Sequence, residues 1–442
     1  MLTRSGSMIA RVAAPAMAIS CDYLVVGAGA SGMSFVDTLL LHAPEPVSVV
    51  LLDKREQPGG HWNDAYDFVT LHQSSRNYGV ESRELKSAHP EMLASKEEVL
   101  TYYRDVLSGW EASGHAVKFV GGVTFDFASI SYSSSDGARE DVSAATVVDA
   151  RYTENDLPIS TPPKFQFSRE HIEVIPPHEL PARRDAAAAP RRYCVLGAGK
   201  TGQDTILHLR QTLQCPIEDI CWVMPTSPWI TARDPPSPRK QITCMELLDA
   251  ALEADAAAGR PPRATASAAF LQRAFESLED RGQVYRIGSD RIGAAEVAPS
   301  TKFMDATLNA REIATLSECA PNVLSGRGRV ASIGDDGSLV FEDGSVVALP
   351  WASEAAGEAT GEGATAAATT TFVHCTASAF AFSSSASEPR PPIFEPRRIT
   401  VQEVSRAASS DGRARIPLRP SGVPSREGRV PPEYLLSSSA TF

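Results

Sequence analysis

Two segments of this chain carry the same pattern of an apolar run, a G-x-G-x-x-G turn and an amphipathic stretch. The segments are YLVVGAGASG at 23–32 and RYCVLGAGKTG at 192–202, and amphipathic runs follow at 33–41 and 203–213. In such a strand–turn–helix unit the first glycine makes the tight turn, the second lets the backbone approach a diphosphate, and the third lets the helix pack on the strand. One copy is compatible with a chance glycine turn, whereas two copies predict two bound dinucleotides and electron transfer between them.

The residues of the two turns are candidate ligands of the diphosphates, which would lie at the N-terminus of each following helix. Lys200 lies inside the second turn, where its charge would act on the diphosphate, although the G-x-x-x-x-G-K spacing of a P-loop is absent. The candidate residues are Gly27, Gly29, Ser31 and Gly32 in the first turn, and Gly197, Gly199, Lys200, Thr201 and Gly202 in the second.

The first turn also has a candidate ribose ligand. The apolar run at 47–53 ends in Asp53, about twenty residues after Gly32. A carboxylate at this strand end accepts hydrogen bonds from ribose hydroxyls in dinucleotide-binding units. The alternative is a solvated aspartate in a turn, and the glycines upstream favour ribose binding.

The run KREQPGGHW at 54–62 places a glycine pair and an aromatic residue directly after this strand. Here the chain resembles the flavin-containing monooxygenase branch of two-dinucleotide flavoproteins, in which a G-G-x-W element runs beneath the flavin. The resemblance covers 21–103 and 192–231, with a weaker echo at 372–377, where His-Cys-Thr-Ala stands in place of an A-T-G strand end returning to the flavin domain. It implies that the FAD ligands include Lys54, Gly60, His61, Trp62 and Ala377.

The family continues with a short strand that carries a polar residue near the reactive edge of the flavin. The corresponding stretch is FVTLHQSSR at 68–76, and His72 occupies the place of the family's asparagine. The resemblance implies catalytic roles for His72 and Gln73, with simple packing as the alternative. Two family features are absent, because no F-x-G-x-x-x-H segment precedes the second turn and VDAR stands at 148–151 where A-T-G is expected. These differences bear on oxygen insertion more than on flavin binding.

The second turn favours NADPH over NADH. The strand expected at 220–224 is followed by Pro-Thr-Ser and, further on, by Arg233, with no acid at the strand end. A hydroxyl and an arginine suit the 2′-phosphate of NADPH, whereas NAD sites usually carry an acid at this position. A solvated loop position is the alternative for Arg233.

Composition is that of a large globular enzyme. Of the 442 residues, 43% are apolar and 22% are charged, and the formal net charge is −12. The acidic balance argues against nucleic-acid binding, and no apolar run approaches the roughly 20 residues of a membrane span. We therefore expect an enzyme with a small-molecule substrate, no nucleic-acid partner and no membrane span.

The seven cysteines are scattered, and no C-x-x-C or C-x4-C pair occurs. Such a set suits a reducing, cytoplasmic location and disfavours a disulfide reductase with a close cysteine pair. No histidine has metal-ligand spacing with cysteines or carboxylates, so we expect no metal. Residues 1–20 contain Arg4 and Arg11 but no acidic residue, as in an organelle-targeting peptide or a short disordered tail.

These observations predict an α/β fold of two Rossmann-like dinucleotide-binding domains, with the NAD(P) domain inserted in the FAD domain. Strands near 329–333 and 338–342 are expected to return to the FAD domain. The predicted parts are a flexible or targeting leader at 1–20, the FAD-binding domain at 21–157, a linker at 158–190, the NAD(P)-binding domain at 191–322, the second part of the FAD-binding domain at 323–404 and an irregular tail at 405–442.

The predicted activity is that of a monooxygenase-like, FAD-dependent NAD(P)H oxidoreductase. Hydride would pass from NADPH to FAD, and electrons would then pass to O2 or to an organic acceptor. Two alternatives stay open: a flavin-dependent reductase or dehydrogenase without oxygen insertion, and a non-catalytic dinucleotide-binding protein. The substrate itself is set by loops that vary between members of this class.

Overall fold

The computed structural model of this chain describes most of the predicted elements. The described residues are 19–151, 157–183, 192–233, 275–276, 278–287, 302–352, 370–376 and 392–401. Ala377, the tail expected at 405–442 and all but the last two residues of the expected leader lie outside these ranges.

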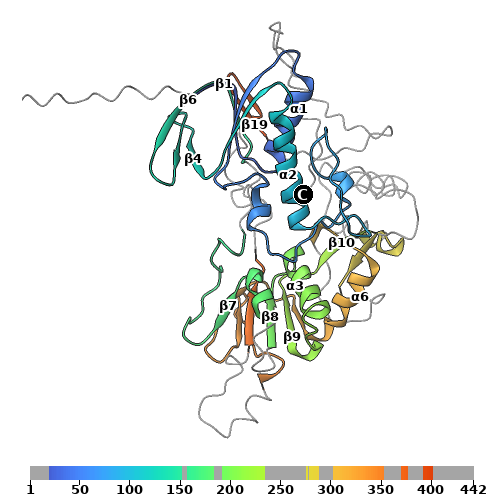
Figure 1. Cartoon of the computed structure of the whole chain (residues 1–442). Helices are drawn as coiled ribbons and strands as arrows, with labels where there is room; N and C mark the ends of the chain where they lie inside the picture. The colour runs from blue at the N-terminus through green and yellow to red at the C-terminus, as the bar shows by residue number, and fades with distance from the viewer. Residues whose placement is uncertain are drawn as a thin grey trace, which may run out of the picture.

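The first unit is built on a mainly parallel sheet in the strand order β18-β19-β6-β1-β2-β3 (Figure 1). Strands β19, β6, β1, β2 and β3 run parallel, while β18 is antiparallel to β19 and the β4–β5 hairpin extends from β6. The strands are β1 (Ile19–Val26), β2 (Ser48–Leu52), β3 (Ala116–Val120), β4 (Val123–Asp126), β5 (Ser131–Ser134), β6 (Arg139–Asp149), β18 (Phe394–Glu395) and β19 (Arg398–Thr400).

Both faces of this sheet are covered, which explains its continuous apolar strands. On one face Val25 and Leu51 pack against helices α1 (Ala30–His42) and α2 (Lys96–Glu111). On the other face Leu24 packs with residues of the β4–β5 hairpin. Because successive side chains of a strand point to opposite faces, an unbroken apolar run serves two cores at once.

The second unit is a parallel sheet in the order β13-β9-β8-β17-β7. Helices α3 (Lys200–Gln211) and α6 (Ala310–Glu318) pack on one face. The antiparallel sheet β14-β15-β16 packs on the other face. The strands are β7 (Glu173–Ile175), β8 (Arg192–Leu196), β9 (Ile220–Met224), β13 (Val323–Ser325), β14 (Val330–Ile333), β15 (Leu339–Phe341), β16 (Val346–Val347) and β17 (Thr370–His374).

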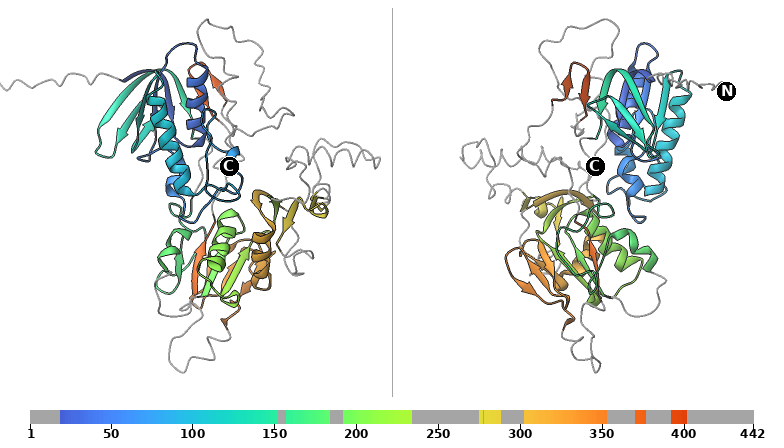
Figure 2. Two further views of the ribbon diagram at one scale, coloured as in Figure 1. Left: turned by 45° about the vertical axis from the view of Figure 1, so that its right-hand side comes forward. Right: turned by 90° about the vertical axis from the view of Figure 1, so that its left-hand side faces the viewer.

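A small sheet in the order β11-β10-β12 lies on the side of the second unit that faces the first (Figures 1 and 2). Its strands are β10 (Pro228–Ala232), β11 (Val284–Arg286) and β12 (Lys302–Leu308). Short 3-10 turns complete the described fold: η1 (Gly60–Asp64), η2 (Ser75–Asn77), η3 (Pro177–Glu179), η4 (Pro181–Arg183), η5 (Ile217–Asp219) and η6 (Ala320–Asn322).

The topology confirms the predicted insertion of one Rossmann-like unit in the other. The chain leaves the first sheet after β6, builds the second unit, and returns as β18 and β19, where β19 pairs in parallel with β6. The fold is therefore α/β with two mainly parallel sheets, and the segment that forms the second sheet is inserted between two segments of the first. Figure 1 shows the first unit above the second, with the glycine-turn helices α1 and α3 in separate units.

The predicted point of return to the first sheet is wrong. Strands β13 to β17 belong to the second unit, and β17 pairs with β8 and β7 rather than with the first sheet. Within 323–404, only the segment 394–400 adds strands to the first sheet. The expected linker at 158–190 also supplies edge strand β7. Buried parallel strands have similar apolar compositions, so the choice of sheet depends on tertiary contacts.

Candidate dinucleotide sites

The first glycine turn joins β1 to α1 at the carboxyl end of the sheet. Gly27 has φ +108°, a conformation that favours glycine, and a Cβ on Gly32 would lie 1.8 Å from the carbonyl oxygen of Gly27. Gly29 is the N-cap of α1 and no side chain caps this helix end. Ser31 and Gly32 lie in the first turn of the helix and are buried. The backbone N–H groups of this turn are thus available to an anion.

Asp53 follows β2 and lies beside the same turn. Its Oδ2 accepts the backbone N–H of Ala28 at 2.7 Å, and its Oδ1 accepts that of Arg55 at 2.8 Å. An ionised carboxylate has about four acceptor positions, so these two bonds leave capacity for ribose hydroxyls. Lys54 is the exposed residue next to it. The ribose role of Asp53 stays a prediction with a suitable position.

The glycine pair lies directly on the first turn. Gly59 and Gly60 both have positive φ, and the N–H of Gly59 donates to the carbonyl oxygen of Ala28 at 2.8 Å. A Cβ on Gly60 would lie 2.7 Å from Cα of Gly29, so the two backbones approach closely. The segment 59–62 therefore forms one wall of the first candidate site, and its place beneath a flavin stays a prediction.

The aromatic residues of this wall are held by the core. The Trp62 indole N–H donates to the Tyr78 hydroxyl at 2.8 Å, and Trp62 is buried. His61 stacks on Trp62, and burial, together with the nearby charge of Arg55, lowers the pKa of His61 to about 4. Both rings are therefore uncharged, preorganised parts of the wall.

The second glycine turn repeats the geometry of the first. Gly197 has φ +132°, and a Cβ on Gly202 would lie 2.1 Å from the Gly197 carbonyl oxygen. Helix α3 starts after Gly199, again without a side-chain cap. The Trp222 indole N–H of β9 donates to the carbonyl oxygen of Gly197 at 2.8 Å, and this hydrogen bond stabilises the turn.

The side chain of Lys200 forms an ion pair within its own helix, α3. Its ammonium group pairs with Asp204, four residues later. The other oxygen of Asp204 accepts the hydroxyl of Tyr66, which comes from the first unit, at 2.7 Å. Thr201 lies beside Lys200, half-buried in the same helical turn. The predicted contact of Lys200 with a diphosphate is thus untested, and the sequence did not indicate its link to Tyr66.

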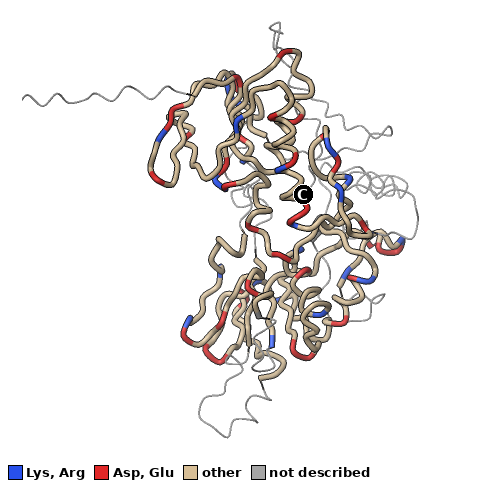
Figure 3. The backbone as a smooth tube through the Cα atoms, in the orientation of Figure 1, with Lys and Arg blue, Asp and Glu red and all other residues tan. Residues whose placement is uncertain are grey.

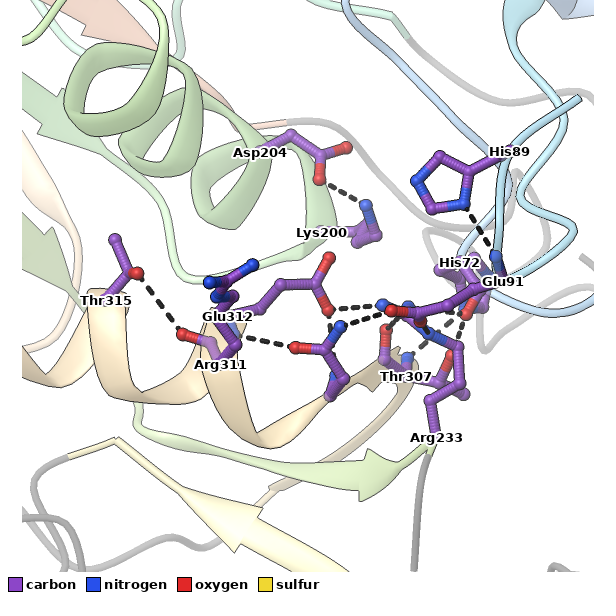
Figure 4. A network of polar contacts seen from close by, with 11 residues as sticks. His72, His89, Glu91, Lys200, Asp204, Arg233, Thr307, Arg311, Glu312 and Thr315 are labelled. Carbon is purple, nitrogen blue, oxygen red and sulfur yellow. Dashed lines mark hydrogen bonds and ion pairs between the residues drawn. The ribbon is translucent and has the colours of Figure 1, made fainter.

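Arg233 lies after β10, and its burial contradicts the alternative of a solvated loop residue. Its side chain is only 9% exposed, so it is not a solvated loop residue. Nε donates to Glu91 at 2.7 Å and Nη2 to Glu312 at 2.5 Å, while Nη1 donates to the carbonyl oxygens of His72 and Thr307, both at 3.1 Å (Figure 4). The guanidinium is engaged within the protein, and its predicted contact with a 2′-phosphate stays a prediction.

His72 lies where the two units meet, with half-buried Gln73 next to it. Its Nδ1 accepts the backbone N–H of Thr307 in β12 at 3.2 Å, and its carbonyl oxygen also accepts the Thr307 hydroxyl. Burial, together with the positive charges of Lys200 and Arg233, lowers the pKa of His72 to about 3. The imidazole is therefore neutral at physiological pH.

No motif in the sequence pointed to the network around His72 and Arg233. His72 bonds Thr307 and Arg233, and Arg233 in turn pairs with Glu91 and Glu312. Only Asn309 with Glu312 had a readable pattern, the N-x-x-E of a capping box. Such a pattern predicts a helix start and says nothing of a partner in another unit.

Within the described residues, no group of histidines, cysteines and acids could hold a metal ion. The six cysteines in these ranges are free and buried, while Cys244 lies outside them. No helix among the described residues is long and apolar enough to cross a membrane.

Fold and turns together define the class: a protein with two Rossmann-like dinucleotide-binding units. Residues 25–81 match the NAD(P)-binding Rossmann-like domain family. The chain is similar to the uncharacterized protein Rv2000 of Mycobacterium tuberculosis (strain H37Rv) and to the uncharacterized protein Mb2023 of Mycobacterium bovis, with 30% identity over 411 residues in each case. These alignments cover 88% of this chain, which spans 65% of the length of either relative.

Solved structures with a similar arrangement include a flavin-containing monooxygenase from Stenotrophomonas maltophilia, at 14% identity and a TM-score of 0.44, covering 88% of this chain and 87% of that one. Another is cyclohexanone monooxygenase from Rhodococcus sp. Phi1 bound to NADP+, at 18% identity and a TM-score of 0.37, covering 75% of this chain and 70% of that one. Both TM-scores are below 0.5.

Proposed function

We propose that this protein is a monooxygenase-like, FAD-dependent NAD(P)H oxidoreductase acting on a small molecule. FAD would bind at the first glycine turn and the nicotinamide dinucleotide at the second. The free, scattered thiols of the described residues support a reducing, cytoplasmic location.

One contrast between the helices carries this proposal. Helices α2 and α6 each start with a complete capping box, built by Ser95 with Glu98 and by Asn309 with Glu312. Helices α1 and α3, which follow the glycine turns, have no side-chain cap. Four N–H groups at a helix start need partners, and a diphosphate supplies them at both uncapped ends.

The residues around the first turn fit FAD. Gly27 and Gly29 would leave room for the diphosphate, Asp53 would bind the ribose, and the wall at 59–62 would lie beside the flavin. The bound flavin supplies the chemistry that protein side chains lack, because it accepts a hydride and passes electrons to O2 or to an organic acceptor.

The chain's own residues would bind the two dinucleotides, orient them toward each other and exclude water from the space between them. The second unit would hold the nicotinamide dinucleotide on Gly197, Gly199 and Gly202 and present it to the first unit. His72, a neutral imidazole between the units, could donate a hydrogen bond but could not serve as an acid at neutral pH.

The coenzyme proposal is NADPH, and it keeps one of the grounds that the sequence suggested. Arg233 is engaged by protein carboxylates, so its guanidinium adds no support. What supports it is the end of β9, where Met224 is followed by Pro225 and Thr226 and no carboxylate would repel a 2′-phosphate.

Anaerobic reduction of the purified full-length protein tests this function. We expect a yellow protein with one FAD per chain that is bleached by NADPH and regains its colour on mixing with O2. A coloured protein that NADPH does not bleach would favour a non-catalytic dinucleotide-binding protein. Bleaching that only an organic acceptor reverses would favour a reductase without oxygen insertion, and a protein that binds no FAD would refute the proposal.

A further inference from the structure

The side chain and backbone of His72 are both held by the second unit. Thr307 of β12 donates its backbone N–H to Nδ1 of His72 and its hydroxyl to the His72 carbonyl oxygen. Arg233, after β10, donates to the same carbonyl oxygen at 3.1 Å. Residue 72 therefore has its rotamer and backbone set by segments more than 150 positions away in the sequence, as its separations of 161 and 235 residues show.

This geometry determines the tautomer of His72. A neutral imidazole has one acceptor nitrogen and one donor nitrogen. Nδ1 faces an N–H group, so Nδ1 is the acceptor and the proton lies on Nε2. A proton on Nδ1 would place two donors face to face and would leave the N–H of buried Thr307 without its acceptor.

The charges around His72 act in the same direction. Burial opposes a positive imidazole most strongly, and the charges of Lys200 at the start of α3 and Arg233 after β10 add to it, so the pKa of His72 is lowered to about 3. The acids of this region, Glu91 and Glu312, are paired with Arg233 rather than with His72. Among the described residues Nε2 has no hydrogen-bond acceptor, so its N–H stays available at the junction of the units.

Arg233 joins the two units at this point. It pairs with Glu91 of the first unit and with Glu312 of the second, while its Nη1 reaches His72 and Thr307. A planar guanidinium can serve these four acceptors together, and a lysine ammonium cannot. Loss of the guanidinium would leave the half-buried Glu312 carboxylate and two carbonyl groups with fewer partners.

We propose that the second unit presents His72 as a neutral Nε2–H hydrogen-bond donor, and that Arg233 is the positioning residue that maintains this state. Use of the donor toward a bound flavin or substrate rests on the proposed function. The tautomer and its dependence on Arg233 do not, because they follow from contacts within the chain.

NMR spectroscopy of the full-length protein labelled with ¹⁵N-histidine tests this proposal, with the His72 signals assigned by their loss in His72→Gln. In the wild type we expect the Nε2–H tautomer and no titration between pH 8 and 5. In Arg233→Lys, which keeps the positive charge but loses the planar set of donors, we expect a mixture of tautomers. The matched control is Arg210→Lys, because Arg210 also bonds a carboxylate and a carbonyl, those of Glu318 and Cys215, within the second unit; its His72 signals should equal the wild type's.

If Arg233→Lys fails to fold by circular dichroism, Glu91→Gln and Glu312→Gln each remove one ion pair at nearly constant volume and should shift the same signals by a smaller amount. A wild-type His72 with its proton on Nδ1, or one that titrates near neutral pH, would overturn the proposal. So would unchanged His72 signals in a folded Arg233→Lys. Since no cofactor is needed, these outcomes are separate from the failure of FAD binding.

Discussion

At the scale of single residues, the glycines of the first turn are glycines for different reasons. Gly32 leaves no space for a side chain, since a Cβ there would lie 1.8 Å from the Gly27 carbonyl oxygen. Gly29 has an ordinary φ of −79°, and its Cβ would meet only Cα of Gly60 at 3.5 Å. Folding therefore requires glycine at 32 but not at 29, and we infer that position 29 is left open for a ligand.

This difference predicts opposite behaviour for two alanine variants. Gly29→Ala should unfold at the wild-type temperature yet bind FAD at least about tenfold more weakly, a loss of roughly 1.4 kcal/mol. Gly32→Ala should lose on the order of 3 kcal/mol of stability, because backbone must move to admit the methyl group. Thermal unfolding and the flavin absorbance retained after gel filtration measure the two effects. Full FAD retention by Gly29→Ala would remove this residue from the proposed site.

At the scale of elements, the helices divide by what satisfies their first N–H groups. Helices α2 and α6 carry their own caps, while α1 and α3 start at glycine turns and have no side-chain cap. The cap of α6 has a second task. The side-chain amide of Asn309 donates through Nδ2 to Glu91 of the first unit at 2.8 Å. Glu312, the N3 residue of the same capping box, binds Arg233. One helix start thus joins local capping to the junction between units.

Removal of the two caps should therefore cost different amounts of stability. Ser95→Ala at the start of α2 should lower the free energy of unfolding by about 1 kcal/mol, the usual value of a cap. Asn309→Ala should cost about 2 kcal/mol, because it loses the cap and the bond to Glu91 together. Urea unfolding of both variants makes the comparison. An equal or smaller loss for Asn309→Ala would show that the bond to Glu91 adds nothing.

At the scale of the whole molecule, specific polar contacts join the two units. Figure 3 shows basic and acidic residues interspersed over both units. The described links include Tyr66 with Asp204, Arg233 with Glu91, and the His178 ring with the carbonyl oxygen of Asp64 at 2.6 Å. Contacts of this kind depend on one relative orientation of the units, which is what hydride transfer between two dinucleotides requires.

The position of Arg233 changes the expected effect on coenzyme choice. If its guanidinium orients the units, Arg233→Lys should raise the KM for NADPH and for NADH by the same factor. If it bound the 2′-phosphate, only NADPH would suffer, by roughly 1.5–3 kcal/mol for a lost charge-assisted hydrogen bond. Steady-state kinetics with both coenzymes separate the two cases, and a loss confined to NADPH would restore the phosphate role.

Much of the fold follows from local sequence signals. The turns at 27–32 and 197–202 were predictable because φ above zero and close helix–strand packing admit only glycine. The position of Asp53 followed from the length of one strand–helix–strand unit. The fold class and the insertion of the second unit could be predicted because each unit repeats these signals within a short stretch of chain.

The tertiary structure alone decided which sheet each late strand joins and what meets between the units. Strand β17 is buried on both faces and would suit either sheet, and only its pairing with β8 and β7 places it in the second. Arg233 looked like a loop residue or a phosphate ligand, yet its partners Glu91, His72 and Glu312 lie 142, 161 and 79 residues away. Hydrogen bonds over such separations leave no periodicity or spacing in the sequence, because they arise only when two folded surfaces come together.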